Sequence, residues 1–269
     1  MPGHDFDRFI GIDYSGAQTP EARLKGLRVY TATPGQLPVE VACPKSETGP
    51  VRYWSRQDIA HWLLERLQTG ERLLIGLDHG FSFPEAYFRR YGLTSWPQFL
   101  DDFCRYWPTD QPHCYANFIR DGNWWERHPK PQGERTGETS WFRLCEQWTS
   151  SAKSVFLFDV QGSVAKSTHT GIPWLRVLRQ QAGEKLFFWP FDGWQPAEGR
   201  SVIVEIYPSI FRNRYPKEGR TADQQDAYAV ARWMEETVRK NALNHYLNPP
   251  LTLAERQTAA LEGWILGIS

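Results

Sequence analysis

The stretch FIGIDYSG at residues 9–16 decides how the fold is interpreted, because an apolar run ends there in a carboxylate, Asp13. Its aromatic and β-branched residues are typical of a buried strand, and the Ser15-Gly16 pair is typical of a turn. The run LLIGL at residues 73–77 repeats this pattern and is followed directly by Asp78. We therefore predict two buried strands, each with an acid at its carboxyl end.

Strand and helix patterns alternate through the rest of the chain. Further strands are predicted at 24–31, 39–43, 155–158, 186–189 and 202–207. Ser55 and Asp58 predict the start of a helix, as N-cap and as an acid in the first turn. Other helices are predicted at 84–91, 96–107, 173–181, 221–246 and 252–261. This alternation predicts a single α/β domain over residues 1–269, with a sheet flanked by helices.

Residues 92–150 interrupt the regular order and form a large, Trp-rich insertion. Its part from 108 to 141 is rich in Pro, Gly, Trp and charged residues, which is typical of an ordered insertion or a long loop. Trp124 and Trp125 stand among arginines, a pattern that suits stacking on unpaired bases. Nearby acids nearly cancel this positive charge, so a lid packed by its own tryptophans stays the alternative.

The composition excludes several classes of protein. The 269 residues contain 31 Lys and Arg against 31 Asp and Glu, so overall charge gives no reason to expect a nucleic-acid or membrane partner. No apolar run approaches the roughly 18 residues of a membrane helix, and the N-terminus does not resemble a signal peptide. Four widely spaced cysteines disfavour a disulfide framework or a thiolate zinc site. We expect a cytoplasmic protein without membrane contact.

Acidic residues recur where the predicted elements meet. Besides Asp13 and Asp78, Glu205 lies in a predicted buried strand, and Asp223 and Asp226 lie at the start of a predicted helix. Ligands of open α/β sheets gather beyond the carboxyl ends of the strands, and carboxylates that converge there repel one another unless a cation joins them. Oxygen ligands without a His or Cys cluster favour Mg²⁺ or Mn²⁺ over zinc.

Each acid also has a structural alternative. Asp13 and Asp78 each stand before turn residues and would fit a simple turn. Glu205 would fit a buried ion pair. Asp223 would fit a helix N-cap, with Asp226 favoured by the helix dipole.

Several motifs together resemble one family, the predicted RNase H-like nucleases grouped as domain of unknown function 429. The resemblance covers most of the chain and is weakest between residues 92 and 150. Its motifs are GIDYSGA (11–17), GLDHGFSFP (76–84), QGSVAKSTHTGIPWLRVL (161–178), VIVEIYPSIF (202–211), DQQDAYAVA (223–231) and EGWILG (262–267).

The resemblance implies an RNase H-like fold, with a five-stranded mixed sheet whose second strand is antiparallel. By position, Asp13 matches the first-strand aspartate, which would bridge two metal ions, and Asp78 matches the acid that closes the fourth strand. Glu205 matches the acid of the EIYP-type motif, and Asp226 the aspartate on the late helix. Asp223, one helical turn earlier, would be a fifth ligand or the cap.

The segment KSTHTG at residues 166–171 precedes the helix expected to begin at Ile172-Pro173. Lys166, Ser167 and Thr168 offer a cation and hydroxyls, and a helix N-terminus adds free N–H groups, so the segment fits a phosphate. His169 would orient a water or a leaving group. A plain surface loop, with Pro at the helix start and a structural histidine, is the alternative.

Three functions follow from these observations. The first is a metal-dependent nuclease that hydrolyses phosphodiester bonds of RNA or DNA with two Mg²⁺ or Mn²⁺ ions. The second is a weakly active or inactive module of the same fold that binds nucleic acid or protein. The third is an actin-like ATPase, which shares the early strand and acid but normally needs two related domains, and the chain shows no internal repeat.

Overall fold

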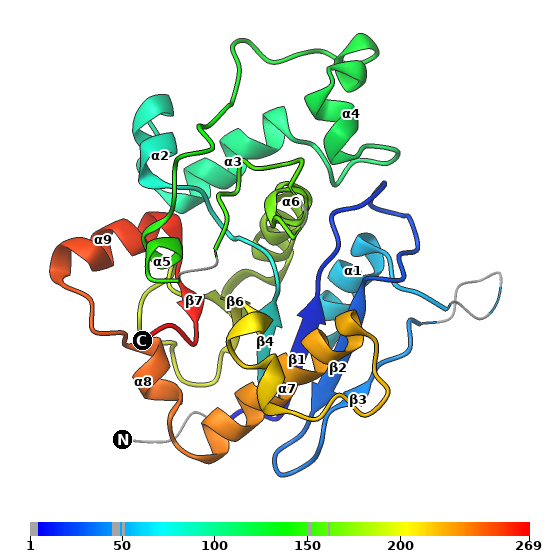
Figure 1. The fold of residues 1–269 in the computed structure, drawn as a ribbon, viewed down its shortest axis with the longest axis vertical. Helices are drawn as coiled ribbons and strands as arrows, with labels where there is room; N and C mark the ends of the chain where they lie inside the picture. The colour runs from blue at the N-terminus through cyan, green and yellow to red at the C-terminus, as the bar shows by residue number, and fades with distance from the viewer. Residues whose placement is uncertain (1–4, 45–48, 50–51, 150–151, 161) are drawn as a thin grey trace.

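A mixed sheet forms the centre of the molecule (Figure 1). The computed structural model describes residues 5–44, 49, 52–149, 152–160 and 162–269. Within them the sheet has seven strands, in the order β3-β2-β1-β4-β6-β5, with β7 paired to β6. Strand β2 runs antiparallel to β1, and β4, β6, β5 and β7 run parallel to it. The strands are β1 (Arg8–Asp13), β2 (Arg28–Ala32), β3 (Val39–Glu40), β4 (Leu73–Leu77), β5 (Leu186–Phe188), β6 (Ser201–Ile206) and β7 (Ile265–Leu266).

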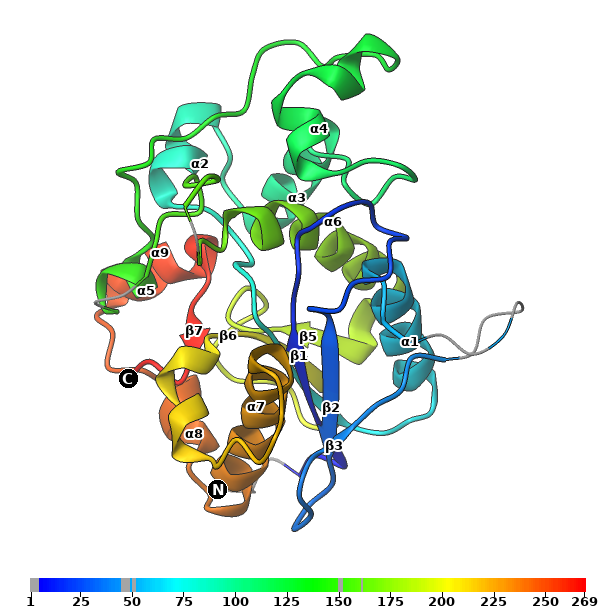
Figure 2. The ribbon, with the colours of Figure 1, turned by 45° about the vertical axis from the view of Figure 1, so that its right-hand side comes forward.

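Helices cover both faces of the sheet. Helices α1 and α6 pack together on one face, α3 packs against α6, and α7 lies across β1 and β2 on the other face (Figures 1 and 2). The helices are α1 (Arg56–Gln68), α2 (Glu85–Tyr91), α3 (Trp96–Tyr106), α4 (Ala116–Arg120), α5 (Leu144–Gln147), α6 (Ala165–Ala182), α7 (Ala222–Arg239), α8 (Leu243–Leu247) and α9 (Leu253–Glu262). None of them combines the length and apolar character that crossing a membrane requires, within the described ranges.

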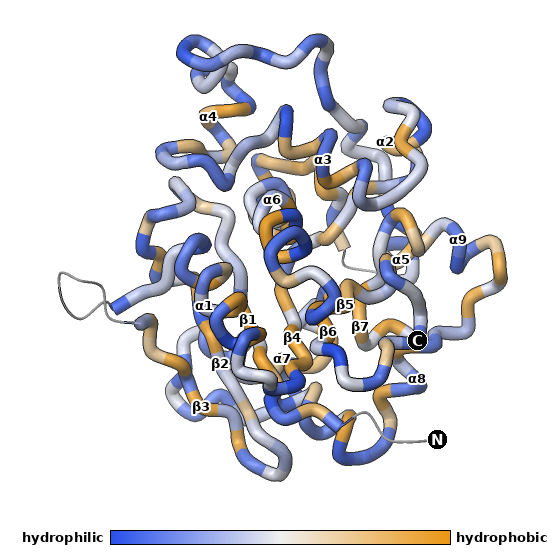
Figure 3. Tube along the Cα trace, turned by 180° about the vertical axis from the view of Figure 1, so that it is seen from behind, coloured by the Kyte–Doolittle hydropathy of each residue, from blue (hydrophilic) through white to orange (hydrophobic). Residues whose placement is uncertain are grey.

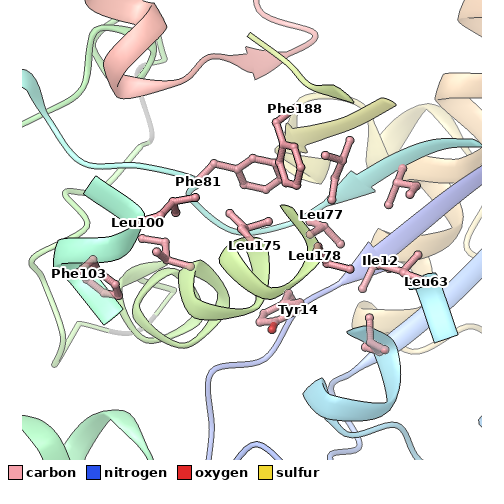
Figure 4. Close-up of a cluster of buried hydrophobic side chains, with 14 of the residues drawn as sticks. Ile12, Tyr14, Leu63, Leu77, Phe81, Leu100, Phe103, Leu175, Leu178 and Phe188 are labelled. Carbon is pink, nitrogen blue, oxygen red and sulfur yellow. The ribbon is translucent and has the colours of Figure 1, made fainter. Parts of the chain in front are cut away.

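Side chains of β1 point alternately to the two faces of the sheet and so reach two separate core clusters. Ile10 and Ile12 belong to the cluster between the sheet and α1, α3 and α6, whereas Phe9 belongs to the cluster on the opposite face. Figure 4 shows Leu77 and Leu175 filling the first cluster beside Ile12. The central strands are accordingly mainly hydrophobic along their length (Figure 3). Both faces of the parallel strands are therefore buried, as expected for such a sheet.

Two strand glycines let α7 approach the sheet closely. A Cβ at Gly11 would lie 2.3 Å from the carbonyl oxygen of Ala227, and one at Gly76 would lie 2.8 Å from Cγ1 of Val230. Backbone and packed side chains leave no room for such an atom. These glycines thus bring the start of α7, with its two acids, to the carboxyl end of β1.

The start of α6 corrects the prediction that a loop covers residues 166–171. The helix begins at Ala165, so Pro173 lies inside it. Proline cannot donate to the carbonyl four residues earlier, which normally disfavours a helix interior. Here that carbonyl, of His169, accepts a hydrogen bond from the Thr109 hydroxyl at 2.9 Å instead. A contact from a distant segment thus compensates the lost helix bond.

Other predictions differ from the structure in extent. The sheet has seven strands instead of five, residues 155–158 form turns instead of a strand, and the strand predicted at 24–31 is β2, from Arg28 to Ala32. The helix predicted to reach residue 246 ends at Arg239, and α8 follows it. Ser55 is the N-cap of α1 as predicted, with Asp58 completing a capping box.

Candidate functional site

Asp13 and Asp78 form an acidic pair at the carboxyl edge of the sheet. Asp13 ends β1 and Asp78 directly follows the neighbouring parallel strand β4, where its N–H donates to the carbonyl of Ile12 at 3.1 Å. Each carboxyl shifts the pKa of the other, so the two side chains lie close together. Burial, and then the charge of Asp226, raises the pKa of Asp78 to about 8. Burial, and then the charge of Asp78, raises the pKa of Asp13 well above its ordinary value.

Helix α7 adds two acids beside this pair. The charges of Asp226 and Asp223 both raise the pKa of Asp13, so both lie near it. Asp226 is also held by Arg212, whose Nη1 lies 3.1 Å from its Oδ2. The N-cap of α7 is Thr221, and Asp223 stands in the first turn, which rules out the cap alternative for Asp223.

A cavity of about 750 Å³ opens beside Asp13 and Asp223. Ser163, just before α6, and Lys166 and Ser167 in its first turn line the cavity as well. The first N–H groups of a helix have no intrahelical partner and carry a partial positive charge. The cavity therefore has acids on one side and a cation, hydroxyls and a helix N-terminus on another.

The loop after β1 is fixed between α1 and α6. Arg56, which is 1% exposed, donates to the carbonyls of Ser15 at 3.1 Å, Ala17 at 2.6 Å and Gln18 at 2.8 Å. Gly16 packs against α6, because a Cβ there would lie 2.2 Å from the carbonyl carbon of Lys166. The sequence pattern around Ser55 predicts the helix start but gives no hint that Arg56 is buried.

Glu205 lies near the acids but is engaged elsewhere. Arg143 donates to it through both terminal nitrogens, at 2.7 and 2.6 Å, and the N–H of Phe81 donates at 3.0 Å. Arg143 also donates to Glu146 at 2.9 Å and is only 1% exposed. The buried ion pair that the sequence left open for Glu205 is thus present. Arg143 thus belongs to the predicted insertion 92–150 but is buried and serves the core.

The residues after Lys166 and Ser167 are structural. Thr168 is buried, and its hydroxyl accepts from the N–H of Gly80 at 3.0 Å. The Nδ1 of His169 lies 2.8 Å from the carbonyl oxygen of Ala165, and aromatic rings surround it. Burial lowers the pKa of His169 to about 3, so this side chain stays neutral. Of the predicted phosphate cradle, only Lys166 and Ser167 line the cavity.

The predicted stacking residues are packed inside the molecule. Trp124 is 7% exposed and stacks on His128 at 3.7 Å between ring centroids, and Trp125 is half-buried against the core. An aromatic residue that does line the cavity is Tyr115, which is 37% exposed and stacks on Phe118 at 5.2 Å. A lone Tyr before a short helix has no sequence pattern that singles it out.

The donor set only partly fits a divalent cation. In the described part of the chain, no three His, Cys, Asp or Glu side chains are arranged to hold an ion. The Asp13–Asp78 pair fits in its chemistry, since two neighbouring carboxylates offer oxygen ligands of the kind Mg²⁺ prefers. Glu205 and Asp226 are held by arginines instead.

Comparisons with known proteins assign no relative. No protein-family model matches the chain, and neither a curated protein nor a solved structure matches it significantly.

Proposed function

We propose that the protein is a metal-dependent phosphodiesterase of the RNase H-like type that acts on nucleic acid. The observation that carries this proposal is the acidic pair Asp13–Asp78 at the ends of two adjacent parallel strands. Asp13 lines the cavity of about 750 Å³, whereas Asp78 lines a smaller one of about 40 Å³ together with Glu205. Strand β2, antiparallel to β1, and the acids of α7 agree with the arrangement that the resemblance implies. Acids whose pKa values are strongly raised by burial and by neighbouring acids are typical of a functional site.

Asp13 and Asp78 would hold the ion, Mg²⁺ or Mn²⁺, with Asp223 beside them. The ion would supply charge stabilisation to a phosphate and lower the pKa of a bound water. Lys166 and the N-terminus of α6 would bind a phosphate across the cavity, where Ser167 adds a hydroxyl. The Arg56 hydrogen bonds hold the loop after Asp13, and Gly16 in this loop packs against the Lys166 backbone of α6.

An unpaired base fits the wall formed by α4. The ring of Tyr115 lines the cavity while Phe118 supports it by stacking. A supported, partly exposed ring is a platform on which any base can stack, and the Asn117 side chain beside it offers both a donor and an acceptor. These features favour a single-stranded or locally unpaired substrate.

The test is cleavage of labelled single strands, duplexes, an RNA–DNA hybrid and a four-way junction in Mg²⁺ or Mn²⁺. Wild type and Glu65→Gln, which changes an exposed acid on α1, are expected to cleave. Asp13→Asn and Asp78→Asn are expected to lose at least a hundredfold in rate, as when a central electrostatic group is removed. Cleavage that survives in both Asp variants would refute the proposal.

A second candidate is a module that binds nucleic acid without cleaving it. The arginine partners of Glu205 and Asp226 favour it, because they occupy two acids that the nuclease hypothesis assigned to metal. This candidate predicts no cleavage by wild type, and binding that Asp13→Asn keeps and Tyr115→Ala weakens about tenfold. Fluorescence anisotropy with labelled single strands in EDTA measures that binding separately from any hydrolysis.

A further inference from the structure

A second, very small cavity lies one residue beyond each member of the acidic pair. Its volume is about 10 Å³, and it is enclosed between β1, β4, α1 and α6. Tyr14, which follows Asp13, and His79, which follows Asp78, both line it, and their rings touch at 4.5 Å between centroids. Arg56 and Trp174 complete its polar lining, and the other side chains are mainly aliphatic.

All four polar residues of this lining carry a buried atom without a hydrogen-bond partner among the described residues. The atoms are Oη of Tyr14, Nε of Arg56, Nε2 of His79 and Nε1 of Trp174. The residues are 8%, 1%, 2% and 7% exposed, respectively. Leaving one such group unsatisfied costs about 1–3 kcal/mol, and four around one cavity are far more than chance would place there.

The hydrogen-bonding capacities of the four atoms complement one another. Nδ1 of His79 lies 2.9 Å from the carbonyl oxygen of Gly80, so the ring hydrogen stands there and Nε2 is an acceptor. Arg56 Nε and Trp174 Nε1 are donors, and the Tyr14 hydroxyl can accept or donate. One water molecule, which accepts two hydrogen bonds and donates two, matches this set of two donors and two acceptors.

The cavity has room for one water molecule and for nothing larger. A volume of about 10 Å³ is close to that of a single water-sized probe, and a buried water typically needs two to four polar partners. Gly171 preserves the space, because a Cβ there would lie 2.6 Å from Nε2 of His79.

We infer that this cavity is a hydration site in which one ordered water joins Tyr14, Arg56, His79 and Trp174. The water ties the chain after β1 to the chain after β4 and anchors both to α1 and α6. Arg56 extends this link, since its terminal nitrogens already hold the carbonyls of Ser15, Ala17 and Gln18. The site thereby positions Asp13 and Asp78 relative to each other, whatever reaction they serve.

The first test detects the water directly. In water-selective NMR experiments on the whole protein, the indole proton of Trp174 is expected to show a cross-peak with a long-lived water. The indole proton of Trp96, whose nitrogen donates to the carbonyl of Phe81 at 2.9 Å, is the matched control and is expected to show none. A Trp174 indole proton without that cross-peak would overturn the inference.

The second test asks whether the water links the two loops. Trp174→Phe and Tyr14→Phe each remove one partner of the water and keep an aromatic ring. Amide hydrogen exchange at Gly80 and Ala17 is expected to accelerate about fivefold in both variants, the effect of losing about one hydrogen bond. Trp62→Phe, a half-buried tryptophan on α1, is the control. Equal exchange in all three variants would show that the cavity does not position these loops.

Discussion

Replacing Asp78 by Asn is expected to stabilise the protein above neutral pH in the absence of divalent cations. The pKa of Asp78 in the folded protein is about 8, against 3.8 for an ordinary aspartate. Between these values the folded state binds more protons than the unfolded state, so the free energy of unfolding falls as pH rises from about 4 to 8. Asparagine carries no titrating proton and removes this loss, while its amide can still donate to Asp13.

The size of the effect follows from the pKa difference. About four pKa units at 1.36 kcal/mol each give roughly 6 kcal/mol at pH 8. Relaxation and water entry reduce the cost of a buried charge, so we expect about half of this value, ~3 kcal/mol. At pH 4, close to the ordinary value of 3.8, only a small part of this loss has occurred, and the variant is expected to lie close to wild type.

Urea unfolding in EDTA from pH 4 to 8.5, followed by tryptophan fluorescence, measures this difference. Burial lowers the pKa of His79 to about 4 and of His169 to about 3, so in both proteins these rings favour the folded state increasingly as pH rises from about 4 to 6.5. The decisive quantity is therefore the difference between variant and wild type. Glu65→Gln controls for the loss of a surface charge. A difference that does not grow with pH would refute the burial of Asp78 beside the charge of Asp226.

Three further predictions concern the structure around the pair. Arg143→Met leaves Glu205 and Glu146 buried without their partner and is expected to lower the free energy of unfolding in urea by about 3–5 kcal/mol. Adding Glu205→Gln in a double variant should restore part of this loss. Equal stability of wild type and Arg143→Met would argue against the cluster. Gly16→Ala forces a methyl group against the Lys166 backbone and is expected to lower stability by at least about 2 kcal/mol. Gly26→Ala, where a Cβ would have its nearest neighbour at 3.7 Å, is expected to be nearly neutral. Similar melting temperatures for the two variants would contradict this packing. The carboxylate of Glu262 accepts hydrogen bonds from the backbone N–H groups of Glu85 and Leu144. Glu262→Gln would turn an amide NH₂ toward one of them and is expected to lower stability by about 1–3 kcal/mol. An unchanged urea midpoint would count against these contacts.

Local patterns in the sequence predict the parts of the fold that depend on neighbouring residues. The apolar runs that end at Asp13 and Asp78 are strands in the structure, and the parallel register of β1 and β4 brings both acids together. The Ser55 capping box likewise depends on residues only three positions apart. Such features are encoded within a few residues, so sequence spacing is enough to predict them.

Contacts between distant residues account for what the sequence could not predict. Proline at position 173 predicts a helix start, but the helix begins at Ala165. The Thr109 hydroxyl that replaces the missing hydrogen bond comes from another segment, so local sequence could not reveal it. Arg143 stands in a region without periodicity, and its partner Glu205 lies 62 residues away. Neither pairing leaves a trace in local composition.

The distribution of counter-charges distinguishes the acidic pair from the other buried acids. Glu205, Glu146 and Glu235 are each at least 96% buried, and each has an arginine within 4 Å. Asp13 and Asp78 have no ion pair with Arg or Lys among the described residues and face each other instead. The chain thus compensates the acids that serve packing, with arginine for these three and with the backbone N–H groups of Glu85 and Leu144 for the buried Glu262. A fold that keeps two neighbouring acids without an arginine or lysine partner bears a cost that packing does not require, and a cation from outside the chain is the simplest group to offset it.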